Sequence, residues 1–415
     1  MTDFKEISKK ALKAKSFMNK LDTDKRNEAL LKVAENLIKD KDSILQANKK
    51  DIERAVAANM NEGRMDRLKL DDKRIAQMAE GVRQVAELPD PLGHVLKEYT
   101  HANGMVIKKV SVPFGVVGII YENRPNVTVD AWALTFKAGN VVILKGGSDA
   151  IESNIAITKS IKDTLNELSI DENAIILIED TDRAVATEFM KQKSFVDVLI
   201  PRGGAGLIKT VVENSLIPVI ETGTGNCHIY IDEDFDLDKA LDIIYNAKTQ
   251  RIGVCNAAES LVVNKKSLEK ILPAMEKRLA EKNVELRADD DSIGYLTGGV
   301  KATEEDFYKE YLDYIMSIKT VNNLDEAIEH INECSTGHSE CIISNIQSNI
   351  DRFLKEIDSA CVYANVSTRF SDGFEFGLGA EIGISTQKLH ARGPMGLNEL
   401  TTYKYIITGN GQVRQ

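Results

Sequence analysis

Cys255 is the residue whose type and surroundings best suit covalent catalysis. It lies between a predicted helix at 235–247 and a predicted strand at 259–263, and its neighbours, among them Gly253 and Asn256, are small or polar. Small flanks leave space for a substrate beside the thiol, and backbone N–H groups at such a junction can stabilise an oxyanion. A single free cysteine is more often a small core residue, so the other motifs of the chain must decide between these interpretations.

Basic residues near Cys255 would support its reactivity, because a cysteine attacks as its thiolate. Lys248 and Arg251 lie seven and four residues before Cys255 in the sequence. The positive charge of either residue would lower the pKa of the thiol.

Asn123 and Asn126 follow a predicted strand at 116–121, within the sequence Tyr-Glu-Asn-Arg-Pro-Asn. The side-chain amide of either residue can donate a hydrogen bond to an oxyanion. Arg124, between them, is a candidate anion-binding residue. The alternative is simple turn formation, which Asn and Pro also favour.

Lys145 and Ser148 follow a strand predicted at 141–144. A lysine at a strand end can reach a ribose or a phosphate. The loop Gly-Gly-Ser that follows contains no carboxylate, and a carboxylate there would bind a ribose 2′-hydroxyl and repel a 2′-phosphate. The sequence therefore favours NADPH over NADH.

Gly203, Gly204 and Gly206 follow a strand predicted at 196–200. Glycines at such a turn let backbone N–H groups approach a phosphate at the N-terminus of the next helix. The spacing is not G-x-G-x-x-G, and an ordinary tight turn explains it equally well.

The elements that must position these residues alternate between strand and helix. The first group of strands is predicted at 116–121, 141–144, 174–178, 196–200 and 217–220. The second group is predicted at 227–231, 259–263, 313–318, 341–344 and 360–364. Helical patterns separate them, which predicts two parallel sheets with helices on both faces. Such sheets bind ligands at the carboxyl ends of their strands.

The residues before and after these two groups predict a different kind of structure. Residues 1–90 show helical periodicity. An Asn-Gly pair at 103–104 between alternating runs predicts a β-hairpin, and a terminal strand at 401–407 is its expected partner. A two-stranded ribbon is marginal in water, so we expect it to extend a sheet across a subunit interface.

The composition limits the possible functions. The chain has 415 residues, of which 43% are hydrophobic, and its formal net charge is −11, which predicts two or three soluble domains and argues against nucleic-acid and anionic-membrane binding. The five cysteines are odd in number and form no C-x-x-C, which indicates a reducing, cytoplasmic setting. Cys334, His338 and Cys341 lack a second ligand pair, so no metal site is expected. No apolar run reaches the length of a membrane span.

The motifs described above occur in one order, with Glu-Thr-Gly-Thr-Gly at 221–225 before the cysteine loop. In combination they resemble the aldehyde dehydrogenase superfamily. The segments at 112–122, 246–251 and 386–396 are similar to those of the branch that reduces an acyl phosphate. The resemblance extends over nearly the whole chain.

The resemblance implies roles for the residues that could do chemistry. Cys255 matches the nucleophile of the superfamily. Asn123 matches its oxyanion-hole asparagine, and Asn126 is close enough in sequence to compete for that role. Glu221 matches the base that activates water in hydrolytic members, which a reductase of acyl phosphates does not need.

The resemblance also implies a nicotinamide cofactor. Lys145 matches the lysine that holds the adenosine ribose, and Ser148 matches a position that helps to choose between NAD and NADP. The turn at 203–206 matches the segment near the pyrophosphate. Glu310 matches a glutamate on the nicotinamide ribose. The cofactor expected from the residues and the resemblance together is NADPH.

The fold implied by the resemblance is α/β and resembles that of aldehyde dehydrogenases. A Rossmann-type cofactor domain is expected at 1–97 and 113–226, and a second α/β domain, the catalytic domain, at 227–370. A β-hairpin oligomerisation arm is expected to combine 98–112 with 390–415.

The implied reaction is the NADPH-dependent reduction of L-glutamyl 5-phosphate to L-glutamate 5-semialdehyde and phosphate, the second step of proline biosynthesis. It would proceed through a thioester on Cys255. The anionic substrate needs basic partners, for which the candidates are Arg124, Arg251, Arg369 and Arg392. A homo-oligomer is expected, and the upstream glutamate kinase is an expected partner because the acyl phosphate is labile.

Two other functions remain open from the sequence. One is an acylating or hydrolytic aldehyde dehydrogenase, which a dependence on coenzyme A or water instead of phosphate would reveal. The other is a non-catalytic nucleotide-binding protein, which resistance of Cys255 to alkylation together with no turnover would favour.

Overall fold

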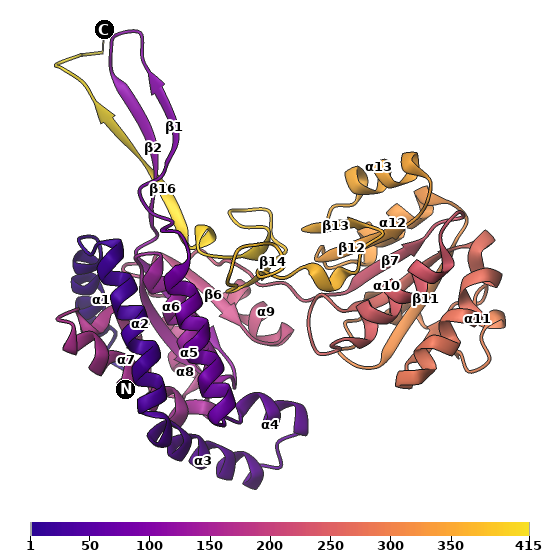
Figure 1. The fold of residues 1–415 in the computed structure, drawn as a ribbon, viewed down its shortest axis with the longest axis horizontal. Coiled ribbons are helices and arrows are strands. Elements are labelled where there is room, and N and C mark those ends of the chain that lie inside the picture. The colour runs from indigo at the N-terminus through magenta and orange to yellow at the C-terminus, as the bar shows by residue number, and fades with distance from the viewer. Residues whose placement is uncertain (1, 415) are drawn as a thin grey trace. The chain divides into compact units, whose positions relative to one another are not determined.

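The computed structural model describes residues 2–414, and the chain divides into two compact units. The first unit comprises Met1–Glu221, Leu378–Gly383 and Met395–Gln415, and the second comprises Thr222–Gly377 and Ile384–Pro394. Each unit contains a parallel sheet with helices (Figure 1), so the predicted α/β class is confirmed.

Five helices precede the sheet of the first unit, as the periodicity of residues 1–90 predicts. They are α1 (Phe4–Met18), α2 (Thr23–Lys39), α3 (Lys41–Ala57), α4 (Glu62–Leu68) and α5 (Asp72–Glu87). In α2, the side chain of Asp22 caps the first turn, and Leu30, Val33 and Leu37 share one buried face. That face packs against neighbouring helices, including α5.

The sheet of the first unit has four parallel strands in the order β5-β4-β3-β6. The strands are β3 (Val116–Tyr121), β4 (Val141–Gly146), β5 (Ile175–Leu177) and β6 (Val198–Arg202). The helices between and after them are α6 (Pro125–Lys137), α7 (Ile151–Glu167), α8 (Arg183–Phe189) and α9 (Ala205–Asn214). Because the chain steps from β3 to β5 in one direction and then returns to β6, right-handed crossovers place α6 and α7 on one face and α8 on the other.

The register of this sheet brings three predicted motifs to one edge. Tyr121 at the end of β3 lies opposite Gly146 of β4 and Arg202 of β6. The loops that carry the asparagines, the lysine and the glycines therefore leave the sheet at the same carboxyl edge, where ligands bind in folds of this kind.

The prediction of a regular strand at 217–220 is wrong. This segment makes one parallel bridge to β6, between Val219 and Leu199. Pro218 has no N–H to donate, which limits the pairing to the bonds around that bridge. The carbonyl of Pro218 still accepts a hydrogen bond from Leu199 N at 2.9 Å.

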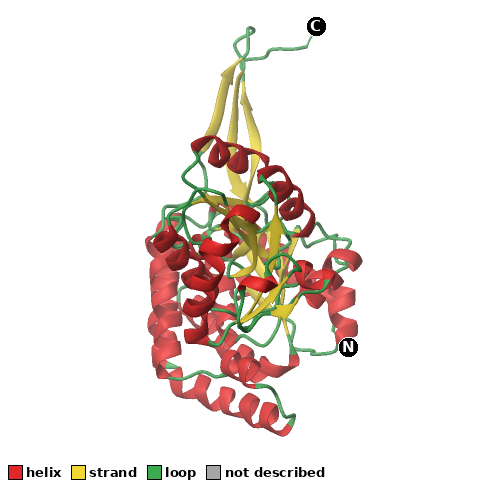
Figure 2. Cartoon of the chain, turned by 90° about the vertical axis from the view of Figure 1, so that its right-hand side faces the viewer, coloured by secondary structure: helices red, strands yellow, loops and turns green. Residues whose placement is uncertain are grey.

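A three-stranded antiparallel arm extends from the first unit. It consists of β1 (Val95–Thr100), β2 (Val106–Pro113) and β16 (Thr401–Thr408), with β2 in the centre. The predicted hairpin and its pairing with the terminal strand are confirmed, and Gly104 takes the left-handed conformation that the hairpin turn requires. Figure 2 shows the three strands extending away from the helices.

The second unit is built on a seven-stranded parallel sheet with the order β10-β9-β11-β8-β7-β12-β13. The strands are β7 (Cys227–Ile231), β8 (Ala258–Asn264), β9 (Glu285–Ala288), β10 (Val300–Lys301), β11 (Ile315–Val321), β12 (Ser339–Ile343) and β13 (Cys361–Ala364). The helices are α10 (Leu237–Thr249), α11 (Leu268–Leu279), α12 (Leu324–Cys334) and α13 (Gln347–Glu356). A separate two-stranded sheet pairs β14 (Gly383–Ser385) with β15 (Gly393–Met395).

Helices cover both faces of the seven-stranded sheet. Ile229 and Ile231 of β7 belong to an apolar cluster with α10 and α11, whereas Tyr230 between them belongs to a second cluster with α12 and α13. This alternation follows from the two-residue period of a strand. The sheet thus holds β7 and β8, which flank the predicted nucleophile, rigidly at its centre.

Among residues 2–414, no helix combines the length and apolar character that crossing a membrane requires.

Candidate active site

The first unit has a cavity of about 290 Å³ at the carboxyl ends of β3 and β4. Lys145, Ser148 and Asn123 line it together with Glu122. Three of the residues that the sequence predicts for catalysis or cofactor binding are therefore neighbours in the structure.

Lys145 is the most deeply placed of these residues. Its side chain is buried at the end of β4, and its Nζ donates a hydrogen bond to the carbonyl of Gly146 at 3.1 Å. Burial lowers the pKa of Lys145, and the negative charges of Asp180 and Asp182 oppose this shift. A buried ammonium with one short protein bond retains donors for a ligand hydroxyl or phosphate.

The glycine turn holds a carboxylate at the start of α9. Oε2 of Glu122 accepts a hydrogen bond from Gly204 N at 3.0 Å. A Cβ atom on Gly203 would lie 2.8 Å from the same carboxylate oxygen, whereas one on Gly206 would meet open space. The turn can therefore bind an anionic group, and the N–H of Gly204 already binds the carboxylate of Glu122.

The two candidate oxyanion donors differ in environment. Asn123 is buried, and its Nδ2 donates to the carbonyl of Arg64 at 3.2 Å. Asn126 is exposed in the first turn of α6, and its Nδ2 donates to Asp130 at 2.9 Å. Arg124 is an exposed residue directly before that helix. Only Asn123 lines the cavity that contains Lys145.

Two cavity residues were missed by the sequence analysis. Arg64 from α4 and Arg183 from α8 both line the cavity, and Arg64 forms an ion pair with Asp149 at 2.8 Å. Both come from helices far in sequence from Lys145, and no local pattern could have identified them. With Lys145 they give the cavity three cationic groups, of which Arg64 is already paired with Asp149, and Glu122 adds a second carboxylate. Lys145 and Arg183 are therefore the first candidates to bind the phosphates of a dinucleotide.

In the second unit, Cys255 lies in the loop between α10 and β8, as predicted. It is partly exposed, whereas Cys227, Cys334, Cys341 and Cys361 are all buried. A turn closes just after it, because Ala257 N donates to the carbonyl of Val254 at 3.1 Å. Cys255 is therefore the cysteine that a substrate can reach most easily.

A buried ion pair joins the two ends of this loop. Nζ of Lys248 lies 2.5 Å from Oε2 of Glu259, and both side chains have no exposed surface. Burial lowers the pKa of Lys248 and raises that of Glu259. The expectation that Lys248 activates the thiol is not supported, since its ammonium is directed at Glu259.

Two arginines lie beside the cysteine loop. Nε of Arg369 donates to Oε1 of Gln250 at 2.8 Å. Burial and then the charge of Arg251 lower the pKa of Arg369, while Asp372 and, to a smaller extent, the Cys255 sulfur act in the opposite direction. Arg251 and Arg369 therefore form a positive patch next to the candidate nucleophile. They are two of the four arginines that the sequence analysis predicts to bind the substrate.

The other side of the loop is fixed to the segment that carries Arg369. Nδ2 of Asn256 donates to the carbonyl of Ser371 at 2.8 Å, and the hydroxyl of Thr368 donates to the carbonyl of Asn256 at 2.7 Å. These bonds couple the position of Arg369 to that of the cysteine loop.

Arg392 and Glu221 lie in environments different from that of the two arginines beside the cysteine loop. Nη2 of Arg392 forms an ion pair with Asp358 at 2.9 Å, so a protein carboxylate already neutralises part of its charge. Glu221 is partly buried at the last residue of the first unit, before Thr222 begins the second.

Glu310 interacts with the segment next to the nucleophile. Its Oε1 accepts a hydrogen bond from Gly225 N at 2.7 Å, and burial raises its pKa. The sequence analysis predicts a cofactor contact for Glu310, and the structure shows in addition that this side chain holds the backbone that leads into β7.

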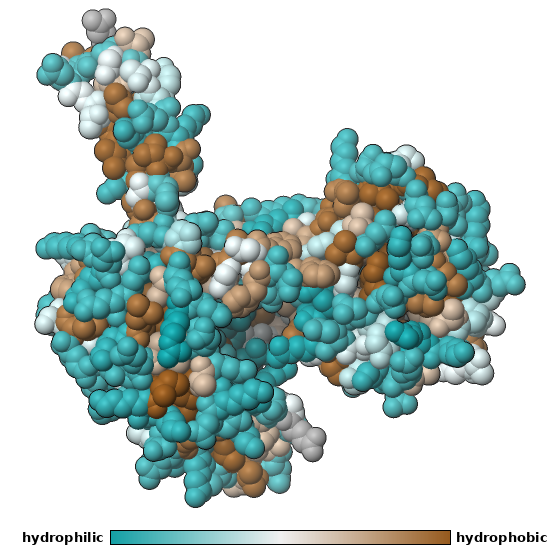
Figure 3. Space-filling view, viewed as in Figure 1, coloured by the Kyte–Doolittle hydropathy of each residue, from teal (hydrophilic) through white to brown (hydrophobic). Residues whose placement is uncertain are grey.

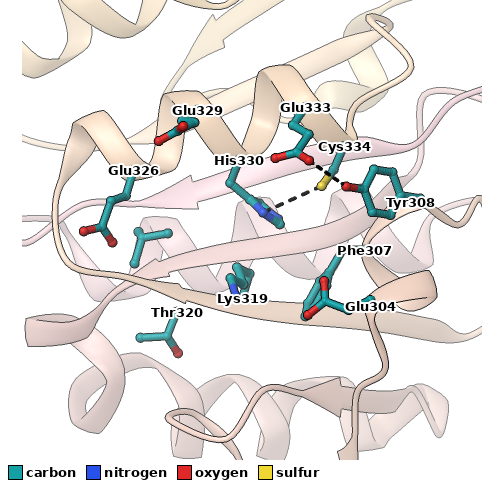
Figure 4. A pocket seen from close by; sticks show the side chains of 11 residues that line it. Glu304, Phe307, Tyr308, Lys319, Thr320, Glu326, Glu329, His330, Glu333 and Cys334 are labelled. Atoms are coloured by element: carbon teal, nitrogen blue, oxygen red, sulfur yellow. Dashed lines mark hydrogen bonds between the residues drawn. The ribbon is translucent and has the colours of Figure 1, made fainter.

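A further cavity of about 360 Å³ lies in the second unit between α12, β11 and the turn Glu304–Tyr308 (Figure 4). Four glutamates and Lys319 line it, and the hydroxyl of Tyr308 donates to Glu333 at 3.0 Å. Burial lowers the pKa of His330 in its wall to about 3. None of the predicted site residues lines this cavity, and no group of three or more metal-ligating side chains occurs among residues 2–414.

The fold and the site together define the class of protein. The model of the aldehyde dehydrogenase family matches residues 1–294 and 296–406. The chain therefore belongs to the aldehyde dehydrogenase family, and it is an oxidoreductase of a kind that uses a nicotinamide cofactor.

Similar proteins narrow this class. The chain is 56% identical, over the full length of both chains, to gamma-glutamyl phosphate reductase of Lachnospira eligens. It is 55% identical to gamma-glutamyl phosphate reductase of Clostridium perfringens, with 98% of each chain covered. The crystal structure of gamma-glutamyl phosphate reductase from Thermotoga maritima superposes with a TM-score of 0.98 at 47% identity, covering 100% of both chains.

Proposed function

We propose that the protein catalyses the NADPH-dependent reduction of L-glutamyl 5-phosphate to L-glutamate 5-semialdehyde and phosphate, the second step of proline biosynthesis. The full-length similarity to gamma-glutamyl phosphate reductases supports this reaction. The observation that carries the mechanism is the partly exposed Cys255 beside the positive patch of Arg251 and Arg369.

The reaction starts at Cys255. Its thiolate attacks the C5 carbonyl carbon of the acyl phosphate, and the carbonyl oxygen becomes an oxyanion. When the oxyanion collapses, the bond to the phosphate oxygen breaks, phosphate leaves with that electron pair, and a thioester remains on Cys255. NADPH, when bound, supplies the hydride that reduces this thioester, and release of the aldehyde regenerates the thiolate.

The oxyanion needs donors that are in place before the reaction. The backbone N–H of Cys255 is one, and the side-chain amide of Asn123 or Asn126 is the second. One such donor contributes about 3–4 kcal/mol in enzymes of comparable chemistry. We favour Asn123, because it is buried and shares its cavity with Lys145.

The negative charges of the substrate are met by arginines. Arg251 and Arg369 are the first candidates because they lie beside the cysteine loop. Arg124 is a further candidate. Arg392 is the weakest candidate, since its ion pair with Asp358 would have to open.

NADPH would be held mainly by the first unit. Lys145 and Ser148 would bind the adenosine ribose and its phosphate, and Arg64 and Arg183 add positive charge to the same cavity. The turn containing Gly203, Gly204 and Gly206 would approach the pyrophosphate once Glu122 gives up its bond to Gly204. Glu310 would bind the nicotinamide ribose. Because phosphate and not water is the acyl acceptor in the reverse reaction, Glu221 needs no role as a base.

The arm supports a proposed homo-oligomer. Its exposed apolar residues are Val95, Leu96, Tyr99, Tyr403, Tyr405, Ile406 and Ile407. Figure 3 shows hydrophobic side chains along the arm, which is the kind of surface that a second copy of a sheet covers. We further propose a cytoplasmic enzyme that works beside the upstream glutamate kinase, which would limit loss of the labile acyl phosphate.

Trapping of the acyl-enzyme tests this proposal. The protein is incubated with L-glutamate 5-semialdehyde and NADP⁺ without phosphate, and the digested protein is analysed by mass spectrometry. We expect a glutamyl adduct on Cys255 that disappears when phosphate is added and is absent from Cys255→Ala. Full turnover by Cys255→Ala, or an adduct on another residue, would refute the mechanism.

A further inference from the structure

We propose that Cys227 is a positioning residue for the nucleophile, because its buried thiol holds the carbonyl group of Cys255. The two cysteines belong to neighbouring elements of the second unit, β7 and the loop before β8. The inference rests on the proposed function of Cys255 as the nucleophile, and it assigns a role to a second cysteine that the mechanism above does not use.

The contact between the two cysteines is specific in geometry. Cys227 is the first residue of β7 and has no exposed surface. Its Sγ donates to the carbonyl oxygen of Cys255 at 3.1 Å. Two further polar groups contact this sulfur: Nδ1 of His338, at the longer distance of 3.8 Å, and the backbone of Ser339. Of the contacts with Cys255 and His338, the one to the carbonyl of Cys255 is the shorter, and in it the thiol is the donor.

The environment of Cys227 keeps this thiol protonated. Burial raises the pKa of Cys227 well above its usual value, and the negative charge of Glu340 raises it further. Glu340 is itself fully buried and accepts a hydrogen bond from His228 N at 2.5 Å. A protonated thiol can donate to a carbonyl, whereas a thiolate could not.

The same carbonyl is enclosed by a second residue of the segment that leads into β7. A Cβ atom on Gly225 would lie only 1.4 Å from the carbonyl oxygen of Cys255. Gly225 and Cys227 therefore both approach the carbonyl of Cys255. Glu310 fixes this segment by accepting the hydrogen bond from Gly225 N.

The position of this carbonyl affects the nucleophile directly. The carbonyl carbon and the Cβ atom of Cys255 share one Cα, so fixing the carbonyl also limits the directions in which the side chain can point. Displacing a reacting group by about 1 Å can reduce a rate by about 100-fold. The structure therefore gives Cys227 influence over the rate without contact with the substrate.

Cys341 provides a matched control for packing effects. It is also fully buried, in β12, which pairs with β7. Its Sγ donates to the carbonyl of Ile342 at 3.4 Å, away from the cysteine loop. Loss of a buried thiol from the same sheet can thus be compared with loss of the contact to Cys255.

The test compares Cys227→Ala and Cys227→Val, which lack a donor, with Cys227→Ser, which retains one. Steady-state kinetics are measured with the semialdehyde, phosphate and NADP⁺, and the rate of alkylation of Cys255 by iodoacetamide is followed by mass spectrometry. We expect the two donor-free variants to lose about tenfold in kcat, with KM within about twofold of the wild type, and to show an altered alkylation rate. Cys227→Ser should recover most of the kcat, and the Ala and Ser variants of Cys341 should remain close to the wild type.

Either of two results would overturn the inference. One is wild-type kcat and alkylation in the donor-free variants, and the other is equal impairment of Cys227→Ser and Cys227→Ala. If Cys227→Ala does not fold, Cys227→Val can be compared with Cys227→Ser instead, because valine fills more of the space that the thiol leaves. A failure of the proposed function would look different, because Cys255→Ala would then keep its turnover whatever residue stands at 227.

Discussion

Nζ of Lys248 lies 2.5 Å from Oε2 of Glu259, and the pair joins the end of α10 to the start of β8. The loop between these residues contains Cys255. Oε1 of Glu259 also accepts a hydrogen bond from Leu312 N at 3.1 Å, two residues after Glu310. The buried carboxylate of Glu259 thus contacts both the end of the loop that contains Cys255 and the segment that contains Glu310.

Removing one partner of this pair should destabilise the protein strongly. Glu259→Gln leaves the buried ammonium of Lys248 without a negative charge, and breaking a buried ion pair in this way costs about 3–5 kcal/mol. We expect a loss of that size in the free energy of urea unfolding and a loss of activity.

The double variant Lys248→Met with Glu259→Leu is the control for this experiment. It removes both charges, so it should be clearly more stable than Glu259→Gln alone. A single variant as stable as the wild type would show that the pair does not hold the loop.

Replacing Gly225 with Ala should reduce activity by about 100-fold or more. Its Cβ would lie 1.4 Å from the carbonyl oxygen of Cys255, so the nucleophile loop would have to move. Gly294→Ala is the control, because a Cβ there meets no atom within 4 Å. Kinetics of both variants check this, and an active Gly225→Ala would show that the approach of the two segments is not needed.

Replacing Arg251 with Ala should weaken substrate binding. Hydrogen bonds to charged groups contribute about 1.5–3 kcal/mol, so KM for the semialdehyde or for phosphate should rise about tenfold to 100-fold while kcat changes less. Alkylation of Cys255 by neutral iodoacetamide should become slower, because iodoacetamide reacts with the thiolate and the positive charge of Arg251 favours that form. Arg278→Ala on α11, which removes an exposed arginine paired with Asp242, should leave KM unchanged. An unchanged KM in Arg251→Ala would exclude a substrate contact.

Asp306 should make stability dependent on acidic pH. Burial alone would raise its pKa, but hydrogen bonds from Thr303 and Arg287 outweigh burial and lower it. The folded pKa thus lies below the unfolded value of about 3.9, so Asp306 stabilises the fold above about pH 4 and loses this effect as the pH falls through the folded pKa.

Urea unfolding between pH 3 and pH 7 tests this expectation for Asp306→Asn. The variant should be less stable than the wild type at pH 7, and the difference should shrink as the pH falls below about 4. Asp290→Asn, which removes an exposed partner of Lys301, should show only a small difference throughout. A difference for Asp306→Asn that stays constant with pH would contradict the assignment.

The sequence predicted the central strands best. The strands β3 and β7 agree with the predicted ranges 116–121 and 227–231. Short, mainly apolar runs of this kind, in β7 interrupted by His228, are typical of buried strands. The short strands β9 and β10, at one end of the seven-stranded sheet, were missed, since they have no apolar run of their own and form only by pairing with β11 and with each other.

The start of α6 was also missed. The sequence analysis gave no helix start in the segment after the strand at 116–121, whereas α6 begins at Pro125, where a proline is favourable because the first helical N–H needs no acceptor. The prediction interpreted Asn-Arg-Pro-Asn as a loop, so it placed Asn126 outside the helix that contains it.

The location of Cys255 in a helix-to-strand loop was predictable, but its partners were not. Lys248 was expected to face the thiol, yet it pairs with Glu259 because a buried ammonium needs a carboxylate. The contact of Cys227 with the carbonyl of Cys255 and that of Glu122 with Gly204 join residues distant in sequence. Such pairs depend on how the sheets assemble, which local patterns do not specify.

The most direct test of the account is NADP⁺ reduction by the protein with L-glutamate 5-semialdehyde, with and without inorganic phosphate, and again with NAD⁺. We predict reduction that requires phosphate, is faster with NADP⁺ and is lost in Cys255→Ala. Reduction of equal rate without phosphate would contradict the account, because water would then be the acyl acceptor and Glu221 would regain a role as the base.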